Sequence, residues 1–409
     1  MLKEKILKFS QHKLVTVFKG NLFSKIILSI GGLILAKYFG TEAYGQYAYF
    51  LSICGILSIL LTVSLEHLMI VEKEEKQKIN NLFFSIIISF ILAIIVLVIS
   101  FLIPQKPSPQ YIFTCAVLSS FLILSLATFS LYLSQIKKFK IIANITIIDS
   151  LSTFVIQSIF AYLDIKNGLI YGTIIGSFIA ILYALKNIPL KIIHPNWQQF
   201  FESIKNNLSI IKYTYPSTLV NAFGNNLLPI LLALYFTKEI LGQYAIAMKM
   251  ITTPFLIISS SFATIYYPKA SELFHFNKMR ELFSYTKKTS WMNFLSTLAI
   301  SIVIILIGTP IINFYYGEEW NLVTQLLILL AIGLVGRSLV NPISNILIIV
   351  KKNYVSLIFN IYLVISIFIA IEVSRNQGIF FLTLYHSLLV AIGYFILYIY
   401  IRKLLAKNE

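Results

Sequence analysis

The sequence is short of charge and of cysteine, and each shortage excludes a class of protein. Only 12% of the 409 residues are charged, and the mean hydropathy is +0.84. Soluble domains carry about 25% charged residues, so this chain is not one of them. The two cysteines, Cys54 and Cys115, lie inside apolar runs, which leaves no disulfide framework. The five histidines form no ligand-spaced cluster and there is no glycine-rich nucleotide loop, so we expect no metal, no ATP and no other cofactor.

Long apolar runs take the place of the missing charge. A helix needs about 20 apolar residues to cross the roughly 30 Å hydrocarbon core of a bilayer. Runs of this length occur twelve times, at 16–39, 44–70, 81–103, 110–135, 141–163, 168–188, 213–236, 241–267, 291–316, 321–350, 354–374 and 378–401. The sequence therefore predicts an all-α polytopic membrane protein with about twelve transmembrane helices.

One fifteen-residue segment occurs twice, at the same place relative to the apolar runs. The segments 35–49 and 232–246 are identical at nine of fifteen positions. Each copy has six spans, and an even number gives both copies the same orientation. We therefore expect two six-helix halves, 1–188 and 213–409, related by a pseudo-two-fold axis along the membrane normal. The cytoplasmic linker between them, 189–212, has the apolar spacing of an interfacial amphipathic helix.

The basic residues are distributed unevenly between the two sides of the membrane. Segments on the side of the N-terminus hold 25 of the 33 lysines and arginines, and the other side holds five: Lys37, Lys106, Lys166, Lys238 and Arg375. The positive-inside rule therefore predicts that both termini are cytoplasmic. The same asymmetry accounts for the net charge of +17, which we attribute to topology and to contact with anionic lipid, not to nucleic acid.

Four spans carry polar residues about four positions apart, which places each set on one helix face. The sets are Asn21, Lys25 and Ser29; Asp149, Thr153 and Gln157; Asn221 and Asn225; and Arg337, Asn341 and Asn345. Single Asn, Ser or Thr residues commonly bond neighbouring helices. A full charge inside a span costs about 2.5–3.5 kcal/mol even on the lenient insertion scale. We therefore predict that these charges and amides line a cavity where the repeats meet.

Three cations, Lys25, Lys249 and Arg337, lie well inside the predicted spans and away from their ends, and Arg337 is the strongest candidate for a ligand contact. Lys25 and Lys249 could also snorkel toward an interface. Arg337 is near the middle of its span, next to the helix-breaking Pro342, and is one of only four arginines. Its planar fork can hold a phosphate with two hydrogen bonds, which a lysine cannot. The intramembrane acids, Asp149 and Glu66, are candidates either for coupling-ion sites or for salt-bridge partners.

Several short motifs carry a family resemblance. The segment 38–47, a span ending in Leu65-Glu66, and the second-copy segments 242–245 and 267–269 resemble those of Wzx-type flippases for O-antigen, lipopolysaccharide and capsule synthesis. These belong to the MATE-like MOP exporter superfamily. The resemblance implies that undecaprenyl-diphosphate-linked oligosaccharide repeat units cross the bacterial inner membrane to its outer leaflet by alternating access. It also implies a polysaccharide polymerase and a chain-length regulator as further partners.

Three other functions are weighed against this resemblance. A MATE-type exporter of small cations would require intramembrane carboxylates, whereas the charges within these spans are net positive. The related lipid II flippases have fourteen spans, and here the seventh span lacks carboxylates and the eleventh has only Glu372, at its outer edge. A membrane polysaccharide polymerase, which would be an enzyme, is expected to have a large outer loop, and every outer loop here is short. The sugars and the coupling ion stay open.

Overall fold

The computed structural model describes residues 2–102, 110–188 and 195–406. Within these residues every regular element is a helix, and eleven helices are long and apolar enough to cross a membrane. This confirms the all-α polytopic fold. The chain separates into two compact units, which are described one at a time: unit 1 comprises Met1–Ala222 and Pro229–Leu234, and unit 2 comprises Phe223–Leu228 and Tyr235–Glu409.

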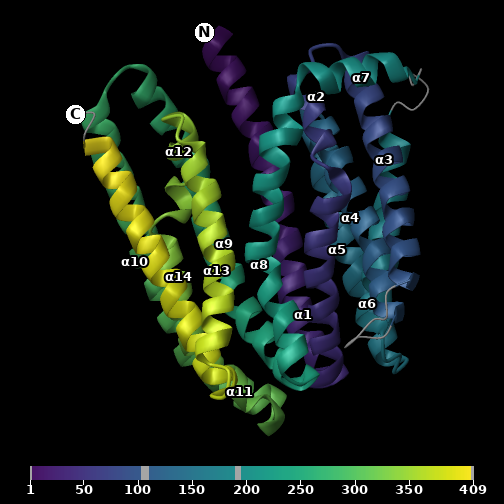
Figure 1. Cartoon of the computed structure of the whole chain (residues 1–409), viewed down its shortest axis with the longest axis vertical. Coiled ribbons are helices and arrows are strands. Elements are labelled where there is room, and N and C mark those ends of the chain that lie inside the picture. Colours follow the sequence, from purple (N-terminus) through teal and green to yellow (C-terminus); the bar gives the residue numbers. More distant parts are fainter. Residues whose placement is uncertain (1, 103–109, 189–194, 407–409) are drawn as a thin grey trace. The chain divides into compact units, whose positions relative to one another are not determined.

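Unit 1 is a bundle in which α1 packs against α4 and α5, and α5 against α6 (Figure 1). Its elements are α1 (Leu2–Thr62), η1 (Leu65–His67), α2 (Leu68–Val71), α3 (Glu75–Leu102), α4 (Gln110–Gln135), α5 (Phe139–Tyr162), α6 (Gly168–Asn187), α7 (Trp197–Asn206), the π-helical turn η3 (Ile210–Thr214) and the start of α8 (Tyr215–Tyr235).

The apolar part of α1 holds two of the predicted spans. It runs from Gly20 to Thr62, and 43 residues of continuous helix would be about 65 Å long, twice the thickness of the bilayer core. Gly40 interrupts it with a φ of 78° and a ψ of 172°, so that two helices meet there. The left-handed φ suits glycine, which has no Cβ to clash. Both predicted spans are present, but the second ends at Thr62 instead of residue 70.

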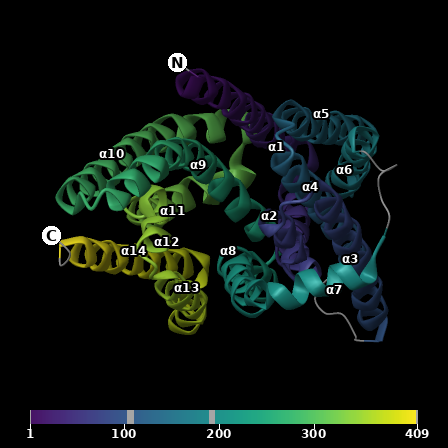
Figure 2. The same ribbon diagram turned by 90° about the horizontal axis from the view of Figure 1, so that it is seen from above.

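Unit 2 is built around α9 and α11, which pack against each other (Figure 2). Helix α9 also packs against α10, and α14 lies between α11 and α13. The elements are α9 (Lys238–His275), α10 (Met279–Ile311), η4 (Ile312–Tyr316), η5 (Glu318–Trp320), α11 (Asn321–Ser338), η6 (Asn341–Ile343), α12 (Ile346–Ile349), α13 (Asn353–Val373) and α14 (Gly378–Ala406). Thr237, which aligns with Gly40 in the repeat, caps the start of α9. The two-fold relation of the halves stays a prediction.

Helix α10 has apolar side chains on its exposed face and several polar ones on its buried face, which is the arrangement expected in lipid. On α10, Leu295 and Leu306 are exposed, whereas Asn293 and Ser301 are buried. The exposed apolar faces are therefore suited to contact acyl chains.

The predicted linker helix is present as α7, which lies across the end of α3 (Figure 2). Asn196 caps it by accepting a hydrogen bond from the backbone N–H of Gln199. Phe200 is fully buried, whereas Trp197 and Phe201 are exposed and stack on each other with centroids 5.6 Å apart. Its position at a lipid interface stays a prediction, and residues 189–194 of the linker lie outside the described residues.

Candidate functional site

The tenth predicted span is broken where Pro342 was expected to break it. Helix α11 ends at Ser338, and only the short turns η6 and α12 follow. Proline has no N–H, so the carbonyl oxygen of Ser338 loses its helical donor. The N–H of Ile343 bonds to Val340 instead of to Leu339. Two consecutive carbonyl groups, those of Ser338 and Leu339, are therefore left without their helical partners.

Side chains of α10 supply the missing donors. The Asn293 amide donates to the Ser338 carbonyl oxygen at 2.7 Å, and the Ser290 hydroxyl donates to the Leu339 carbonyl oxygen. The Ser259 hydroxyl of α9 lies 3.1 Å from the Asn293 amide nitrogen. All of these side chains are fully buried. The break is therefore held by a polar network, and Ser338 fixes the backbone directly beside Arg337.

Arg337 lies in the last turn of α11 with part of its side chain exposed. Its guanidinium carbon is 6.0 Å from the ring centroid of Tyr394, and its Nε atom is buried without a hydrogen-bond partner. Within the described part of the chain no carboxylate lies in ion-pair distance of Arg337. The negative end of the α11 dipole and the face of Tyr394 therefore stabilise a cation that has no acidic partner.

The other predicted site residues of unit 2 lie on three elements. Asn341 and Asn345 follow Arg337 on the broken segment and are half-buried. Lys249 is half-buried on α9, the helix that packs against α11. Asn225 is exposed on α8, and Pro229 removes the N–H that would bond the Asn225 carbonyl group.

In unit 1 the polar set of the first span is only partly exposed. Asn21 and Lys25 are exposed, whereas Ser29, one turn further on, is buried. Asn221, near the start of α8, is also exposed. Among the described residues, no acid forms an ion pair with Lys25.

The polar residues of the fifth span lie between two helices of unit 1, whereas a cavity shared by the two repeats would require them to be accessible. The Ser177 hydroxyl donates to Asp149 at 2.9 Å, Thr153 packs against Gly176, and the Gln157 amide donates to the Leu169 carbonyl oxygen at 2.8 Å. These contacts all join α5 to α6. Thr153 and Gln157 are therefore buried interhelical contacts, and Asp149 has a hydroxyl as its hydrogen-bond partner.

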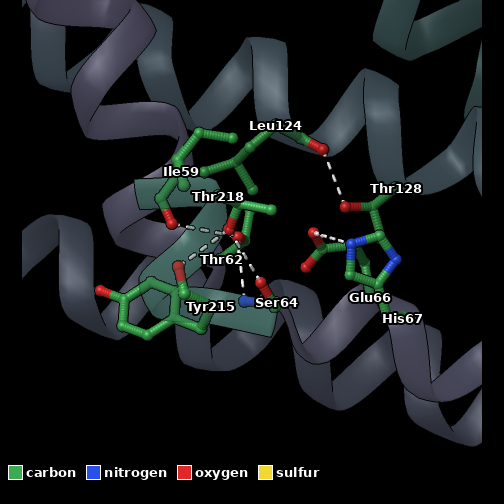
Figure 3. A network of polar contacts seen from close by, with 9 residues as sticks. All are labelled: Ile59, Thr62, Ser64, Glu66, His67, Leu124, Thr128, Tyr215 and Thr218. Atoms are coloured by element: carbon green, nitrogen blue, oxygen red, sulfur yellow. Dashed lines mark hydrogen bonds and ion pairs between the residues drawn. The ribbon is translucent and has the colours of Figure 1, made fainter. Parts of the chain in front are cut away.

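Glu66 lies just beyond the end of α1, outside the membrane-spanning helices (Figure 3). Val63 and Ser64, with φ of 51° and 57°, end the helix, and Glu66 follows in the turn η1. One carboxylate oxygen is 3.8 Å from His67 Nε2, and the other is buried without a hydrogen-bond partner. Burial raises the pKa of Glu66, against smaller opposing effects of backbone hydrogen bonding, His67 and Thr62.

This turn contacts the start of α8. The Ser64 hydroxyl lies 3.5 Å from that of Thr218 (Figure 3). The Tyr215 hydroxyl donates to the Leu60 carbonyl oxygen at 3.4 Å. A change in the charge of Glu66 would therefore change the electrostatic field next to a contact between α1 and α8.

Sequence reasoning missed Asn293, Ser290 and Ser259. An asparagine in an apolar span is ambiguous by itself. The signal that could have pointed to Asn293 is Pro342 in the tenth span, because a span broken by proline leaves carbonyl groups that need donors from another helix.

The fold of the chain is similar to that of several solved membrane proteins. The chain is similar to the lipid II flippase MurJ in an inward closed conformation, with a TM-score of 0.75 and 17% identity over 95% of this chain and 87% of that one. It is also similar to an inward-facing multidrug-resistance MATE transporter of the MOP superfamily, with a TM-score of 0.63 and 12% identity over 95% of each chain. These similarities establish the fold of a multi-pass membrane protein.

The sequence comparisons establish the family. A family model described as polysaccharide biosynthesis protein matches residues 34–325, and the chain therefore belongs to that family. The teichuronic acid biosynthesis protein TuaB of Bacillus subtilis strain 168 is 26% identical over 221 residues. That match covers 53% of this chain and 43% of TuaB, so less than half of the relative's length is matched.

Proposed function

We propose that this protein is a flippase that carries undecaprenyl-diphosphate-linked oligosaccharide repeat units from the cytoplasmic to the outer leaflet of the bacterial inner membrane. Family membership supports a cargo from polysaccharide biosynthesis, and the transporter fold supports movement across the membrane. The observation that carries the proposal is Arg337, a cation in a broken span that has no carboxylate partner among the described residues.

The charges inside the spans favour an anionic cargo. Lys25, Lys249 and Arg337 are set against one acid, Asp149. Glu372, at the end of α13, is exposed and pairs with Arg375 at 3.5 Å. A diphosphate carries about two negative charges and requires cations on its path, whereas an exporter of cationic small molecules, the alternative function, requires carboxylates.

The proposal gives each predicted residue a role. Arg337 holds the diphosphate with its planar fork, and Lys25 and Lys249 add positive charge. Asn21, Asn221, Asn225, Asn341 and Asn345 offer amides to phosphate or sugar oxygens. Asp149 and Glu66 are the candidates for ion coupling. A polymerase and a chain-length regulator would receive the delivered units.

Replacing Arg337 tests the proposal. In a flippase-null strain, Arg337→Ala should abolish surface polysaccharide while the protein stays inserted at normal abundance. Arg337→Lys should restore only part of the activity, because the charge is kept and the fork is lost. Arg375→Ala is the matched control, since that arginine is exposed on a loop, and it should be fully active. Full activity of Arg337→Ala would contradict the proposal.

We also propose that both termini are cytoplasmic, because 25 of the 33 basic residues lie on that side in the predicted topology. Reporter fusions at Glu318–Trp320 should then report an outer location, and fusions at Lys137–Lys140 and Lys351–Lys352 an inner one. An outer C-terminus would refute the orientation.

A further inference from the structure

Unit 1 contains a pocket of about 350 Å³ at the end of the bundle where α1 breaks at Gly40. Three segments far apart in the sequence form it: residues on both sides of the α1 break, the start of α4, and the loop between α5 and α6. None of the residues discussed for the proposed cargo site lines it. Its volume lies in the range of small-molecule sites, about 300–1,000 Å³.

Close packing joins the loop between α5 and α6 to the break in α1. A Cβ on Gly168, the first residue of α6, would lie 2.5 Å from the Cβ of Phe160 and 2.9 Å from the ring of Phe39. Glycine is therefore needed for this approach. Asp164, in the same loop, has a left-handed φ of 53°, which an aspartate tolerates better than most residues. The loop and the α1 break thus form one wall of the pocket.

Hydrogen bonds hold two pairs of side chains in the pocket. The Gln46 amide donates to the Glu42 carboxylate at 3.2 Å, and the Tyr111 hydroxyl donates to the side-chain Oδ1 of Asn167 at 3.2 Å. The amides of Gln46 and Asn167 keep further donor capacity, because a primary amide carries two N–H bonds.

The second copy of the repeat uses the same glutamine differently. Gln243, which aligns with Gln46, accepts a hydrogen bond from the backbone N–H of Leu322 at 3.0 Å and so fixes the start of α11. Gln46 makes its contact with Glu42, four residues away on its own helix, and lines the pocket. The structural role seen in the second copy therefore does not account for Gln46.

The lining combines aromatic faces with groups that bind hydroxyls. Tyr38 and Tyr111 are 69% and 38% exposed, so that their rings are accessible to a ligand. Tyrosine rings pack against the C–H faces of sugars, while carboxylates and amides bind vicinal hydroxyl groups.

Charge narrows the choice of ligand. The lining contains Glu42, Asp164 and a single cation, Lys166, so it offers no excess of positive charge for a diphosphate. In the described part of the chain no cluster of three metal-ligating side chains occurs, which disfavours a metal ion. A neutral, hydroxyl-rich ligand fits both facts.

We propose that this pocket is a saccharide-binding site for a neutral or N-acetylated sugar of about one or two rings. Its lining shares no residue with the set assigned to the diphosphate, and its placement on the outer side rests on the proposed topology. Two sources share this chemistry: the glycan of the lipid-linked cargo as it leaves, and polysaccharide already outside.

The test is saccharide binding by the purified full chain in lipid nanodiscs. The probes are methyl glycosides and disaccharides of neutral hexoses and N-acetylhexosamines, with inorganic pyrophosphate as a separate arm. Tyr38→Ala and Asp164→Asn should each weaken sugar binding at least tenfold. Tyr162→Ala is the matched control, because Tyr162 is a 90% exposed aromatic beside the pocket that does not line it, and binding should be unchanged.

Further arms separate this proposal from the proposed function. Arg337→Ala should lose flipping and keep sugar binding. If Tyr38→Ala also slows flipping of the lipid-linked unit, the pocket serves the cargo glycan, and if flipping is unchanged it serves glycan already outside. Absence of sugar binding by the wild-type chain, sugar binding unaffected by both pocket variants, or tighter binding of pyrophosphate than of any sugar would overturn the proposal.

Discussion

Asn293 shows how a single buried amide can determine the geometry of a whole segment. It replaces the backbone donor that Pro342 removes, and it does so one residue away from Arg337. Asn341 and Asn345 are the same residue type on the broken segment itself, yet they are half-buried, with their side chains partly accessible. Residue type alone therefore cannot separate an amide that supports the backbone from one that is accessible to a ligand.

Asn293→Ala should destabilise the protein by about 1–3 kcal/mol, since it leaves the buried Ser338 carbonyl group without a donor. Thr297→Val, one turn along α10, is the matched control. The Thr297 hydroxyl is buried without a hydrogen-bond partner, so its isosteric removal should be neutral or stabilising. Thermal unfolding in detergent measures both variants, and equal losses would mean that the network contributes nothing.

Glu66 gives a prediction about pH. Burial raises its folded-state pKa, so the folded protein holds this proton more tightly than the unfolded chain. Ionising the buried carboxyl group therefore lowers the free energy of unfolding. This loss of stability is absent below the ordinary carboxyl pKa and grows as the pH rises from there through the raised pKa of the folded state. Each unit of difference costs about 1.4 kcal/mol.

Glu66→Gln should therefore raise the unfolding temperature at pH 7 and leave it unchanged at pH 4. His67 also titrates nearby, and His67→Gln in both backgrounds separates its contribution. An equal effect of Glu66→Gln at both pH values would show that the carboxylate is not destabilised by burial.

At the scale of elements, the helices could be predicted closely because lipid requires long apolar runs. The prediction was wrong for the end of the second span, where residues 63–70 are apolar enough to continue the helix. The positive φ values of Val63 and Ser64 end it there, and hydropathy carries no record of that turn. Similarly, the spacing of Thr153 and Gln157 predicted one polar face, but only the structure shows that α6 covers it.

The α5–α6 contact depends on glycine. A Cβ on Gly176 would lie 2.6 Å from the backbone nitrogen of Thr153, and the backbone cannot retreat as a side chain can. Gly176→Ala should therefore destabilise the protein by about 1–3 kcal/mol or more.

Gly224→Ala on α8 is the control for this contact, because its added methyl would meet nothing closer than 3.7 Å. Helix propensity then favours alanine by about 1 kcal/mol, so this variant should be neutral or stabilising. Equal unfolding temperatures for the two variants would contradict a tight α5–α6 interface.

For the whole molecule, the charge of the proposed cargo leads to a prediction about the energy source of the flippase. A diphosphate carries about two negative charges outward, and the membrane potential is positive outside. At 100 mV this favours transfer by about 4.6 kcal/mol if both charges cross the full field. The potential can therefore drive the loaded step. Ion coupling through Asp149 or Glu66 would then be needed only for the return of the empty carrier.

Flipping in proteoliposomes should then follow the sign of an imposed potassium-diffusion potential, with or without a proton or sodium gradient. Asp149→Asn and Glu66→Gln should slow turnover and leave cargo binding intact, because each acts on the return step. Arg337→Ala should lose cargo binding itself, which separates the two roles. If the rate ignores the potential and depends strictly on one ion gradient, the electrophoretic mechanism is wrong and obligate antiport is the better account, since the gradient would then drive the loaded step directly.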